Sequence, residues 1–388
     1  MRRLTLLVLL LVTADLTLWS AVVPLLPHYR ASLHLTTTQV GLVLAAFSAA
    51  VVVVAVPAGH LADRLGARAV TAAGVAMLAA ATASLGLAGD FRELLAARVF
   101  QGAADAVVWT AGIAWVAAAT PPLQRGRVIA VVEGGATVGI IAGPLVGGVA
   151  TSLVGISVTF LGAAALLLVL LVWTLLEPPA AVRGAGGSRL ADSLRASVRE
   201  PVIAAAMAMI LLVSVVGATL QLLVPLRLAD LGFGRSGIGL VFTAAAVIGT
   251  GCTVLSGRGG DRVGRLPLAI AACAGLAVTA ALLALPSGRA PFVAVVVAAA
   301  GVQSVLYAVG YPLGADGADR ARIGHGVVQG IVNLVWGVGA VVGPVAGARL
   351  AQSAGTDVSY LVLAALCLVA AGGLERARRV AAAAGAGV

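Results

Sequence analysis

The sequence contains no lysine, and only 10% of its 388 residues are charged. The missing lysine excludes a standard Walker-type phosphate loop, so we do not expect ATP bound to this chain to supply energy. The three cysteines lie inside apolar runs and the four histidines are scattered over segment ends and connections. These residues lack the spacing of a metal site or a disulfide framework, and no Gly-x-Ser-x-Gly elbow occurs. We therefore expect no enzyme activity, no metal and no cofactor.

Hydrophobic residues make up 61% of the chain, more than one water-soluble core could bury. Runs of about 18 or more apolar residues are long enough to cross a bilayer as helices. Nothing in the sequence shows the ten-residue alternating pattern of an outer-membrane barrel. We therefore predict an all-α membrane protein with twelve transmembrane helices. The predicted spans are 4–26, 38–58, 69–88, 93–119, 127–153, 154–176, 201–226, 236–256, 266–286, 290–314, 325–347 and 358–374.

A polar stretch at 177–200 separates the first six predicted spans from the last six. The same charged turn, Gly-x-x-x-Asp-Arg-x-Gly, begins at Gly59 in the first half and 198 residues later at Gly257 in the second. Such a repeat indicates an internal duplication. The sequence therefore predicts two six-helix bundles, 1–176 and 201–388, joined by a central loop.

The arginines are distributed unevenly over the connections between spans. Eighteen of the 25 fall on one set of alternating connections, which includes both termini and the 177–200 loop, and six fall on the other set. This asymmetry predicts that both termini and the central loop are cytoplasmic. We attribute the net charge of +10 to topology and to contact with anionic lipid, and we expect no nucleic-acid partner. The first apolar run is too long for a signal peptide and lacks a small-x-small cleavage site, so it is predicted to be a span.

Asp15 lies near the middle of the first span, about 17 Å from its start at 1.5 Å per residue. A carboxylate at the centre of a bilayer costs about 2.5–3.5 kcal/mol and usually marks a functional site. Its protonation depends on its neighbours, so Asp15 is a candidate for proton coupling or cation contact. Two structural alternatives remain open: a bond to a neighbouring helix, and a permanent ion pair with Arg98.

The fourth span carries a polar face. Arg98 and Asp105 are two turns apart, about 10 Å along the helix, so each is expected to have a partner on another helix. An ion-pair network that only holds helices together is the alternative interpretation. Glu133, early in the fifth span, is a third candidate acid, although its side chain could also reach water. The residues spaced along one side of the fourth span are Arg98, Gln101, Gly102, Asp105, Trp109 and Gly112.

Closely spaced glycines flank a proline in two spans, at Gly143-Pro144 and, 200 residues later, at Gly343-Pro344. Such glycines let a neighbouring backbone approach closely, and the proline can bend the helix. Packing alone would explain each run, but the recurrence points to surfaces along which the two halves move.

Three of these motifs resemble those of the major facilitator superfamily. Gly59-x3-Asp63-Arg64-x-Gly66-x-Arg68 resembles its signature between helices 2 and 3, and Arg98-x2-Gln101-Gly102 resembles its helix 4 motif. Gly139-x3-Gly143-Pro144-x2-Gly147-Gly148 resembles the helix 5 motif of its antiporters. The second copy of the turn departs from the signature, because Arg265 comes one position early and Leu266 takes the matching place.

The run from Asp15 to Pro27 is similar to helix 1 of drug:proton antiporters and vesicular amine transporters, whose acid contacts cations or protons. Asn333 and Tyr307 stand where the vesicular transporters carry acids in helices 11 and 10. The resemblance therefore implies that coupling through ionisable groups lies mainly in the amino-terminal half.

The resemblance also implies six plus six helices around a central cavity, with alternating access to its two sides. Proton coupling would fall to Asp15, Asp105 and Glu133. The expected cavity residues are Asp15, Trp19, Arg98, Gln101, Asp105, Trp109, Gln221, Gln303, Tyr307, Asn333 and Trp336. The expected gating residues, whose charges could alternatively just fix topology and a tight turn, are Gly59, Asp63, Arg64, Gly66, Arg68, Asp261, Arg262, Gly143, Pro144, Gly343 and Pro344.

The leading hypothesis is a secondary transporter that exports small amphipathic compounds in exchange for protons. An importer or facilitator of a small metabolite, with Arg98 binding an anion, is the alternative transport function. A non-transporting membrane sensor or scaffold is the alternative of another class. The expected partners are a small-molecule substrate, protons and the lipid bilayer, and we expect a monomer in the cell (inner) membrane.

Overall fold

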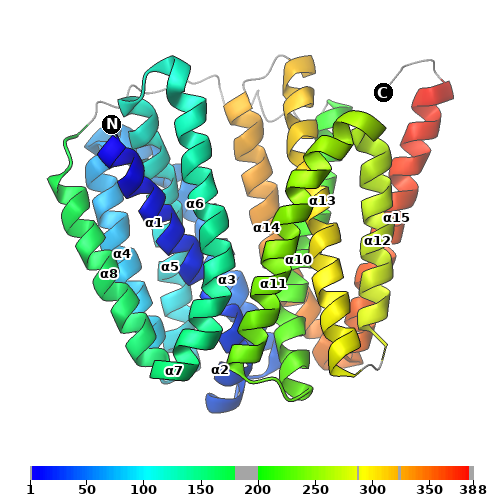
Figure 1. Ribbon diagram of the computed structural model, residues 1–388, viewed down its shortest axis with the longest axis horizontal. Helices are drawn as coiled ribbons and strands as arrows, with labels where there is room; N and C mark the ends of the chain where they lie inside the picture. Colours follow the sequence, from blue (N-terminus) through cyan, green and yellow to red (C-terminus); the bar gives the residue numbers. More distant parts are fainter. Residues whose placement is uncertain (1, 180–199, 286–287, 322–324, 384–388) are drawn as a thin grey trace. The chain divides into compact units, whose positions relative to one another are not determined.

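A computed structural model describes residues 2–179, 200–285, 288–321 and 325–383. Every regular element in that part of the chain is a helix, and twelve helices are long and apolar enough to cross a membrane (Figure 1). The prediction of an all-α protein with twelve spans is confirmed. The elements are α1 (Arg2–Ala21), η1 (Val23–Leu25), α2 (Leu26–Ser32), α3 (Thr37–Leu65), α4 (Ala67–Leu87), α5 (Phe91–Ala119), η2 (Pro122–Gln124), α6 (Arg125–Leu145), η3 (Val146–Ala150), α7 (Thr151–Val154), α8 (Ile156–Leu176), α10 (Pro201–Asp230), α11 (Arg235–Val263), α12 (Arg265–Leu283), α13 (Arg289–Ala321), α14 (His325–Ala354) and α15 (Thr356–Ala383).

The chain divides into two compact units. The first contains Met1–Gly186 and Pro225–Thr243, and the second contains Gly187–Val224 and Ala244–Val388. Helices α10 and α11 therefore contribute to both units, whereas the predicted bundles meet at a single boundary in the central loop. Most of that loop, 180–199, lies outside the described residues.

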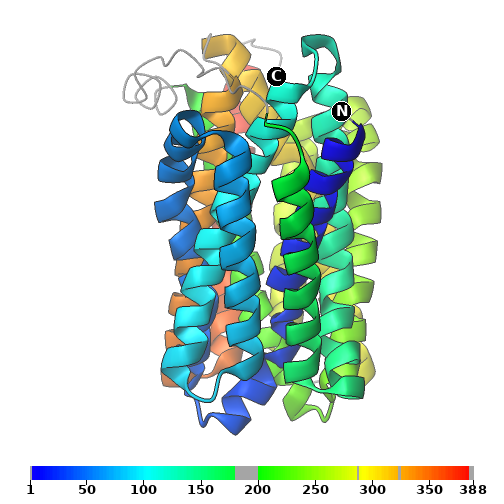
Figure 2. The same cartoon turned by 90° about the vertical axis from the view of Figure 1, so that its left-hand side faces the viewer.

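In the first unit α1 packs along α6, and α4 packs against both α5 and α8 (Figures 1 and 2). The contact of α1 with α6 and the start of η3 follows from glycines placed every fourth residue. A Cβ atom built on any of these glycines would collide with α1, at Thr13, Thr17, Ser20 or Ala21. The two helices are thus in contact through their backbones, as small-residue stripes allow inside a membrane. The glycines are Gly135, Gly139, Gly143 and Gly147.

Two predicted spans are interrupted. The first was expected to run unbroken over 4–26, but α1 ends at Ala21 and a 3₁₀ turn leads into α2. Pro24 and Pro27 lie in this stretch, and each removes a backbone N–H that a continuous helix would use. The fifth span changes to a π-helical turn, η3, two residues after Pro144, and a proline inside a helix is a common cause of such a local change.

Four single glycines join consecutive helices. Gly66 lies between α3 and α4, Gly155 between α7 and α8, Gly264 between α11 and α12, and Gly355 between α14 and α15. Their φ angles are +88°, +89°, +92° and +102°, a range that residues other than glycine rarely adopt. This single-glycine connection thus occurs twice in each half of the sequence, whereas the repeated charged turn accounts for only one connection in each half.

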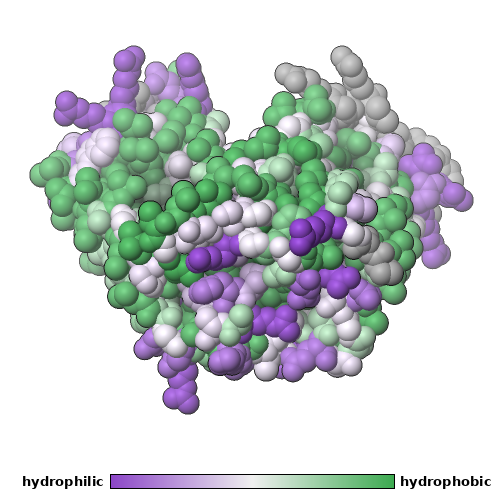
Figure 3. Space-filling model, turned by 60° about the horizontal axis from the view of Figure 1, so that its bottom comes forward, coloured by the Kyte–Doolittle hydropathy of each residue, from purple (hydrophilic) through white to green (hydrophobic). Residues whose placement is uncertain are grey.

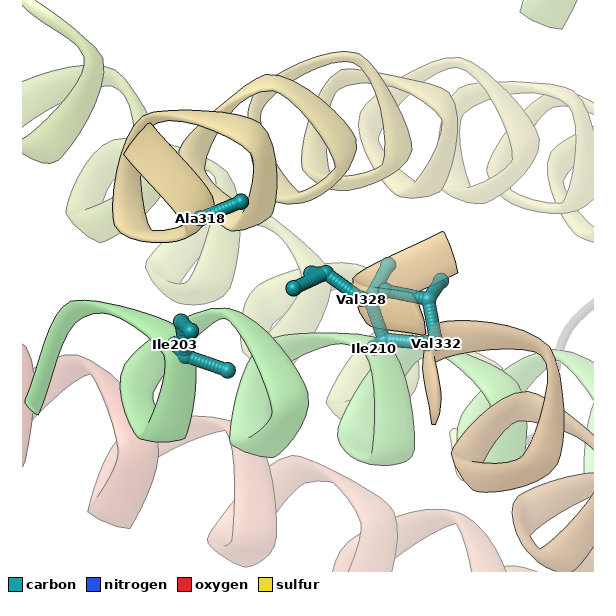
Figure 4. Packing of buried hydrophobic residues seen from close by; sticks show 5 residues of the cluster. All are labelled: Ile203, Ile210, Ala318, Val328 and Val332. Carbon is teal, nitrogen blue, oxygen red and sulfur yellow. The ribbon is translucent and has the colours of Figure 1, made fainter. Parts of the chain in front are cut away.

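The second unit repeats the glycine packing with different partners. A Cβ atom on Gly339, Gly343 or Gly347 of α14 would meet α10 at Ser214 or Thr219. Thr219 Oγ1 also donates a hydrogen bond of 3.0 Å to the Gly343 carbonyl. Elsewhere in this unit, α10, α13 and α14 share an apolar cluster (Figure 4). It contains Ile203, Ile210, Ala318, Val328 and Val332.

Large apolar side chains also cover much of the outside. Leu153, Leu176 and Val369 are among those left exposed, and continuous apolar areas separate groups of hydrophilic residues (Figure 3). A water-soluble monomer rarely exposes apolar patches of this extent. These side chains are therefore lipid contacts, and the chain is a multi-pass membrane protein.

Replacing Gly66 with alanine should lower thermal stability, because φ near +88° strains any residue with a Cβ. We expect a loss of about 1–3 kcal/mol, measured as a lower melting temperature of the detergent-solubilised protein. Gly162→Ala is the matched control, since Gly162 lies within α8 and a Cβ there meets no atom within 4 Å. Equal melting temperatures for the two variants would contradict the role given to this connection.

Candidate functional site

Asp15 is the most buried acid of the first unit, with a side chain that is fully inaccessible to solvent. Among the described residues, neither carboxyl oxygen has a hydrogen-bond partner of good geometry. Its carboxyl group lies close enough to that of Asp105 on α5 for the two to interact electrostatically. The bilayer-spanning part of α1 therefore presents an acid to a second acid.

Arg98 makes its hydrogen bonds to an amide and a backbone carbonyl, and the carboxyl of Asp105 is near enough for electrostatic attraction. Its Nη1 donates to Gln101 Oε1 at 2.6 Å and its Nε donates to the Val43 carbonyl at 3.4 Å. Its guanidinium carbon lies 4.7 Å from the centre of the Phe47 ring, a cation–π contact. Within the described part of the chain no ion pair within 4.0 Å forms at Arg98. The sequence alternative of a permanent pair between Asp15 and Arg98 is therefore wrong.

Gly102 explains why Phe47 reaches Arg98. A Cβ on Gly102 would collide with the Phe47 backbone, so only glycine allows α3 and α5 to approach this closely. Phe47 also faces Trp19 of α1, with ring centres 6.4 Å apart. Phe47 thus lies between a cation and an aromatic ring. The sequence did not predict the roles of Phe47 and Val43, because both belong to a long apolar run in which no polar residue or motif indicates a contact with the site.

The site contains three buried polar atoms that make no hydrogen bond of good geometry with a described residue: both Asp15 oxygens and Gln101 Nε2. Leaving one such atom unsatisfied costs about 1–3 kcal/mol, so most buried polar atoms in folded proteins are paired. By contrast, the hydroxyl groups of Thr13, Thr17 and Ser20 on α1 bond to backbone carbonyls of their own helix at 2.6–2.8 Å. Elsewhere in the first unit Thr71 Oγ1 and Trp115 Nε1 also lack a hydrogen bond to a described residue. At the site the unpaired atoms belong to an acid and an amide, which can take up a proton, water or a ligand.

A second polar cluster lies in the second unit. Trp336 Nε1 donates to the Tyr307 hydroxyl at 3.1 Å, and the Tyr307 and Tyr311 rings stack with centres 6.2 Å apart. Gln303, one turn before Tyr307 on α13, reaches α10, where its amide nitrogen fills the space beside Gly217. The structure thus brings together Gln303, Tyr307 and Trp336 of the predicted cavity residues.

The other predicted residues are more dispersed. Asp105 and Trp109 are half-buried on α5, and Gln221 is half-buried on α10. Asn333 and Glu133 are exposed, and Glu133 has no hydrogen bond or ion pair with any described residue. The described residues contain no group of three or more His, Cys, Asp or Glu side chains that could hold a metal ion.

The sequence profile of the Major Facilitator Superfamily matches residues 8–326 and 229–382 of this chain. The chain belongs to the major facilitator superfamily. Its polar sites therefore lie in a member of this superfamily.

Curated relatives match only part of the chain. The MFS-type transporter ppzB of Metarhizium majus (strain ARSEF 297) is 34% identical over 158 residues, 39% of this chain and 35% of the relative. Quinolone resistance protein NorA of Staphylococcus aureus (strain MSSA476) is 24% identical over 59% of each chain. The Tetracenomycin C resistance and export protein of Streptomyces glaucescens is 28% identical over 34% of this chain and 25% of the relative. The chain thus spans less than two thirds of the length of these relatives.

Solved structures match nearly the whole chain. A bacterial homolog of the human lysosomal transporter Spinster has a TM-score of 0.78 at 18% identity, covering 97% of this chain and 96% of that chain. The nucleoside transporter NupG has a TM-score of 0.78 at 15% identity, covering 96% and 98%. At these identities the likeness establishes the fold only.

One residue of the superfamily signature turn, Arg68, holds the end of a neighbouring helix of the same unit. Arg68 Nη1 donates to the Glu177 carbonyl at 3.1 Å and to the Leu175 carbonyl at 3.5 Å, at the carboxyl end of α8. A cation is favourable there because the last carbonyls of a helix carry partial negative charge. Asp63 and Arg64 are exposed and have no ion pair within the described residues. Of these three charged residues, Arg68 has a hydrogen-bonding partner, the end of α8, and the sequence pattern did not predict that contact.

The second copy of the turn makes a different contact. Arg265, which comes one position early in the sequence pattern, forms an ion pair with Asp316 of α13. The side chains of Asp261 and Arg262 lie outside the described ones. The glycine and proline pairs Gly143-Pro144 and Gly343-Pro344 are buried within their own units. The two copies thus differ in structure as they do in sequence.

Gly102→Ala should destabilise the protein, because the added methyl group would meet backbone rather than a side chain that can move. Overpacking of this kind typically costs about 1–3 kcal/mol. The measurement is the melting temperature in detergent, with Gly112→Ala on the same face of α5 as control. There the nearest atom is Val8 Cγ1 at 3.4 Å, the end of a side chain. A control as unstable as Gly102→Ala would argue against the close contact of α3 with α5.

Arg68→Gln should release the carboxyl end of α8. We expect faster amide hydrogen exchange in a peptide covering residues 170–179, since two hydrogen bonds to its last carbonyls are lost. Arg64→Gln removes the same charge from an exposed neighbour and should leave exchange in that peptide unchanged. If both variants exchange like the unmodified protein, Arg68 does not hold this helix end.

Proposed function

We propose that this transporter exports small amphipathic compounds, cationic ones in particular, in exchange for protons. The observation that carries the proposal is the buried carboxyl of Asp15, which lies beside the carboxyl of Asp105 and has no other polar partner among the described residues. Such an arrangement is costly for a protein that only needs stable packing, and it suits a group that exchanges its partner during a transport cycle.

Two carboxyl groups that lie side by side are difficult to ionise together, and the pair readily holds one proton between them. Loss of that proton adds one negative charge to the site, which attracts a cationic substrate. Return of a proton removes the charge and favours release of the substrate. In this scheme proton and substrate compete for Asp15 and Asp105, and each shifts the population of transporter conformations through its differential affinity.

The surroundings fit an amphipathic cation better than an anion. Trp19 lies one turn after Asp15 on α1, so its aromatic ring is near the acid, and a cation can lie against such a ring. Arg98, the group that an anionic metabolite would need, is already engaged by Gln101, the Val43 carbonyl and the Phe47 ring. We therefore assign Arg98 to positioning and charge balance, and the import of an anionic metabolite is the weaker alternative.

Two relatives support the direction of transport that we propose. NorA is named as a quinolone resistance protein, and the Streptomyces relative is named as a resistance and export protein. Export of compounds through this chain is consistent with both. We further propose that both termini face the cytoplasm, from the arginine asymmetry, and that the signature turns and the glycine-packed pairs α1 with α6 and α10 with α14 take part in gating.

Asp15→Asn should abolish proton exchange while keeping the shape of the side chain. Purified protein in liposomes with an imposed pH gradient would be given ethidium, an amphipathic fluorescent cation, and both dye movement and internal pH would be recorded. We expect proton movement driven by the dye in the unmodified protein, and none above empty liposomes in Asp15→Asn. Asp105→Asn should weaken the coupling in the same assay.

Asp230→Asn is the matched control, because it removes one exposed acid at the end of α10. It should couple like the unmodified protein. Melting temperatures in detergent would establish that all variants are folded. Unchanged coupling in Asp15→Asn would refute the proposal, and dye movement without proton movement would favour a facilitator. Folded protein that moves neither dye nor other amphipathic compounds would favour a sensor or scaffold.

A further inference from the structure

A cavity of about 570 Å³ opens at the point where α1 and α6 begin. Four polar side chains line it, from the first turns of the two helices and the turn before α6, and apolar residues including Leu9 and Val131 line the remainder. The four polar residues are Arg2, Thr5, Gln124 and Arg127. The cavity is separate from the Asp15 site described above and belongs entirely to the first unit.

The charge of this cavity is uncompensated. Neither Arg2 nor Arg127 forms an ion pair with a described residue, and no acid lines the cavity. The amino-terminal end of a helix adds partial positive charge, and both α1 and α6 start here. Two guanidinium groups that face one space without an anion create a site complementary to a phosphate.

The apolar wall distinguishes this cavity from a simple anion site. Leu9 lies seven residues after Arg2 on α1, about 10 Å further along the helix, and Val131 is one turn beyond Arg127 on α6. A Cβ on Gly135 would meet Leu9 and Thr13 of α1, whereas nearer the helix beginnings the cavity lies between Arg2, Thr5 and Leu6 of α1 and Arg127 and Val128 of α6. The two helices thus diverge towards their beginnings, and the space between them has charged and apolar ends.

We infer that this cavity binds an anionic phospholipid, with its phosphate at Arg2 and Arg127 and an acyl chain along Leu9 and Val131. Basic pockets between spanning helices are suited to anionic headgroups. The apolar wall can contact the acyl chain of a lipid, which free phosphate does not have. The paired positive charges repel the cationic compounds proposed as substrates, so the cavity is not a second substrate site. The lipid would hold apart the ends of two helices that glycines hold together further along.

Native mass spectrometry of the full chain in detergent would test this inference with phosphatidylglycerol and phosphatidylcholine as probes. We expect one phosphatidylglycerol to bind more tightly than phosphatidylcholine. In Arg2→Gln/Arg127→Gln its affinity should fall roughly tenfold or more, from the loss of two charge contacts. The control Arg3→Gln/Arg379→Gln removes two exposed arginines and should keep that affinity.

A second variant tests the apolar part. Val131→Trp fills the cavity without a change of charge and should also weaken phosphatidylglycerol binding, while inorganic phosphate should not displace the bound lipid. An equal loss of affinity in the Arg3→Gln/Arg379→Gln control would overturn the inference in favour of general surface charge. Displacement by inorganic phosphate would overturn it in favour of a free anion. Neither readout depends on transport activity, so the proposed function can fail while this one holds.

Discussion

The backbone contact between α1 and α6 fixes much of the first unit. Glycines on α6 let α1 approach so closely that the hydroxyl groups on that side of α1 bond mainly to carbonyls of their own helix, and Ser20 Oγ also reaches the Gly139 carbonyl of α6. Asp15 belongs to the same helix but meets α5. Because small residues bring lipid-embedded helices together where a hydrophobic driving force is absent, this packing decides which side of α1 carries chemistry.

The sequence predicted the fold well because the bilayer restricts what a chain can do. Twelve long apolar runs must become helices, since each backbone group in lipid needs a hydrogen bond within its own segment. The interruptions after Ala21 and Leu145 were missed because proline fixes where a helix is disturbed but not how the chain recovers. The positive-φ glycines after α7 and α14 were likewise missed, because no charged motif accompanies them.

The candidate site was only partly predictable. Asp15, Arg98 and Asp105 stood out because ionisable residues are rare in apolar runs, and the structure brings them into one region. Their pairing did not follow from that signal: spacing on a helix gives the face of each residue, but which residues meet across helices depends on packing. Gly102 set that packing by admitting Phe47, and an aromatic residue within a run of valines and alanines carries no mark of such a role.

The single-glycine connections have a mechanical consequence. A one-residue joint leaves no spare chain, so the helices on either side of Gly66 or Gly355 can hardly change their spacing without unwinding a turn. The two helices of each such hairpin therefore tend to move together, and a displacement of one helix is passed on to the other. The compliance that a moving transporter needs must come from the longer links, such as the stretch from Leu33 to Thr36 between α2 and α3.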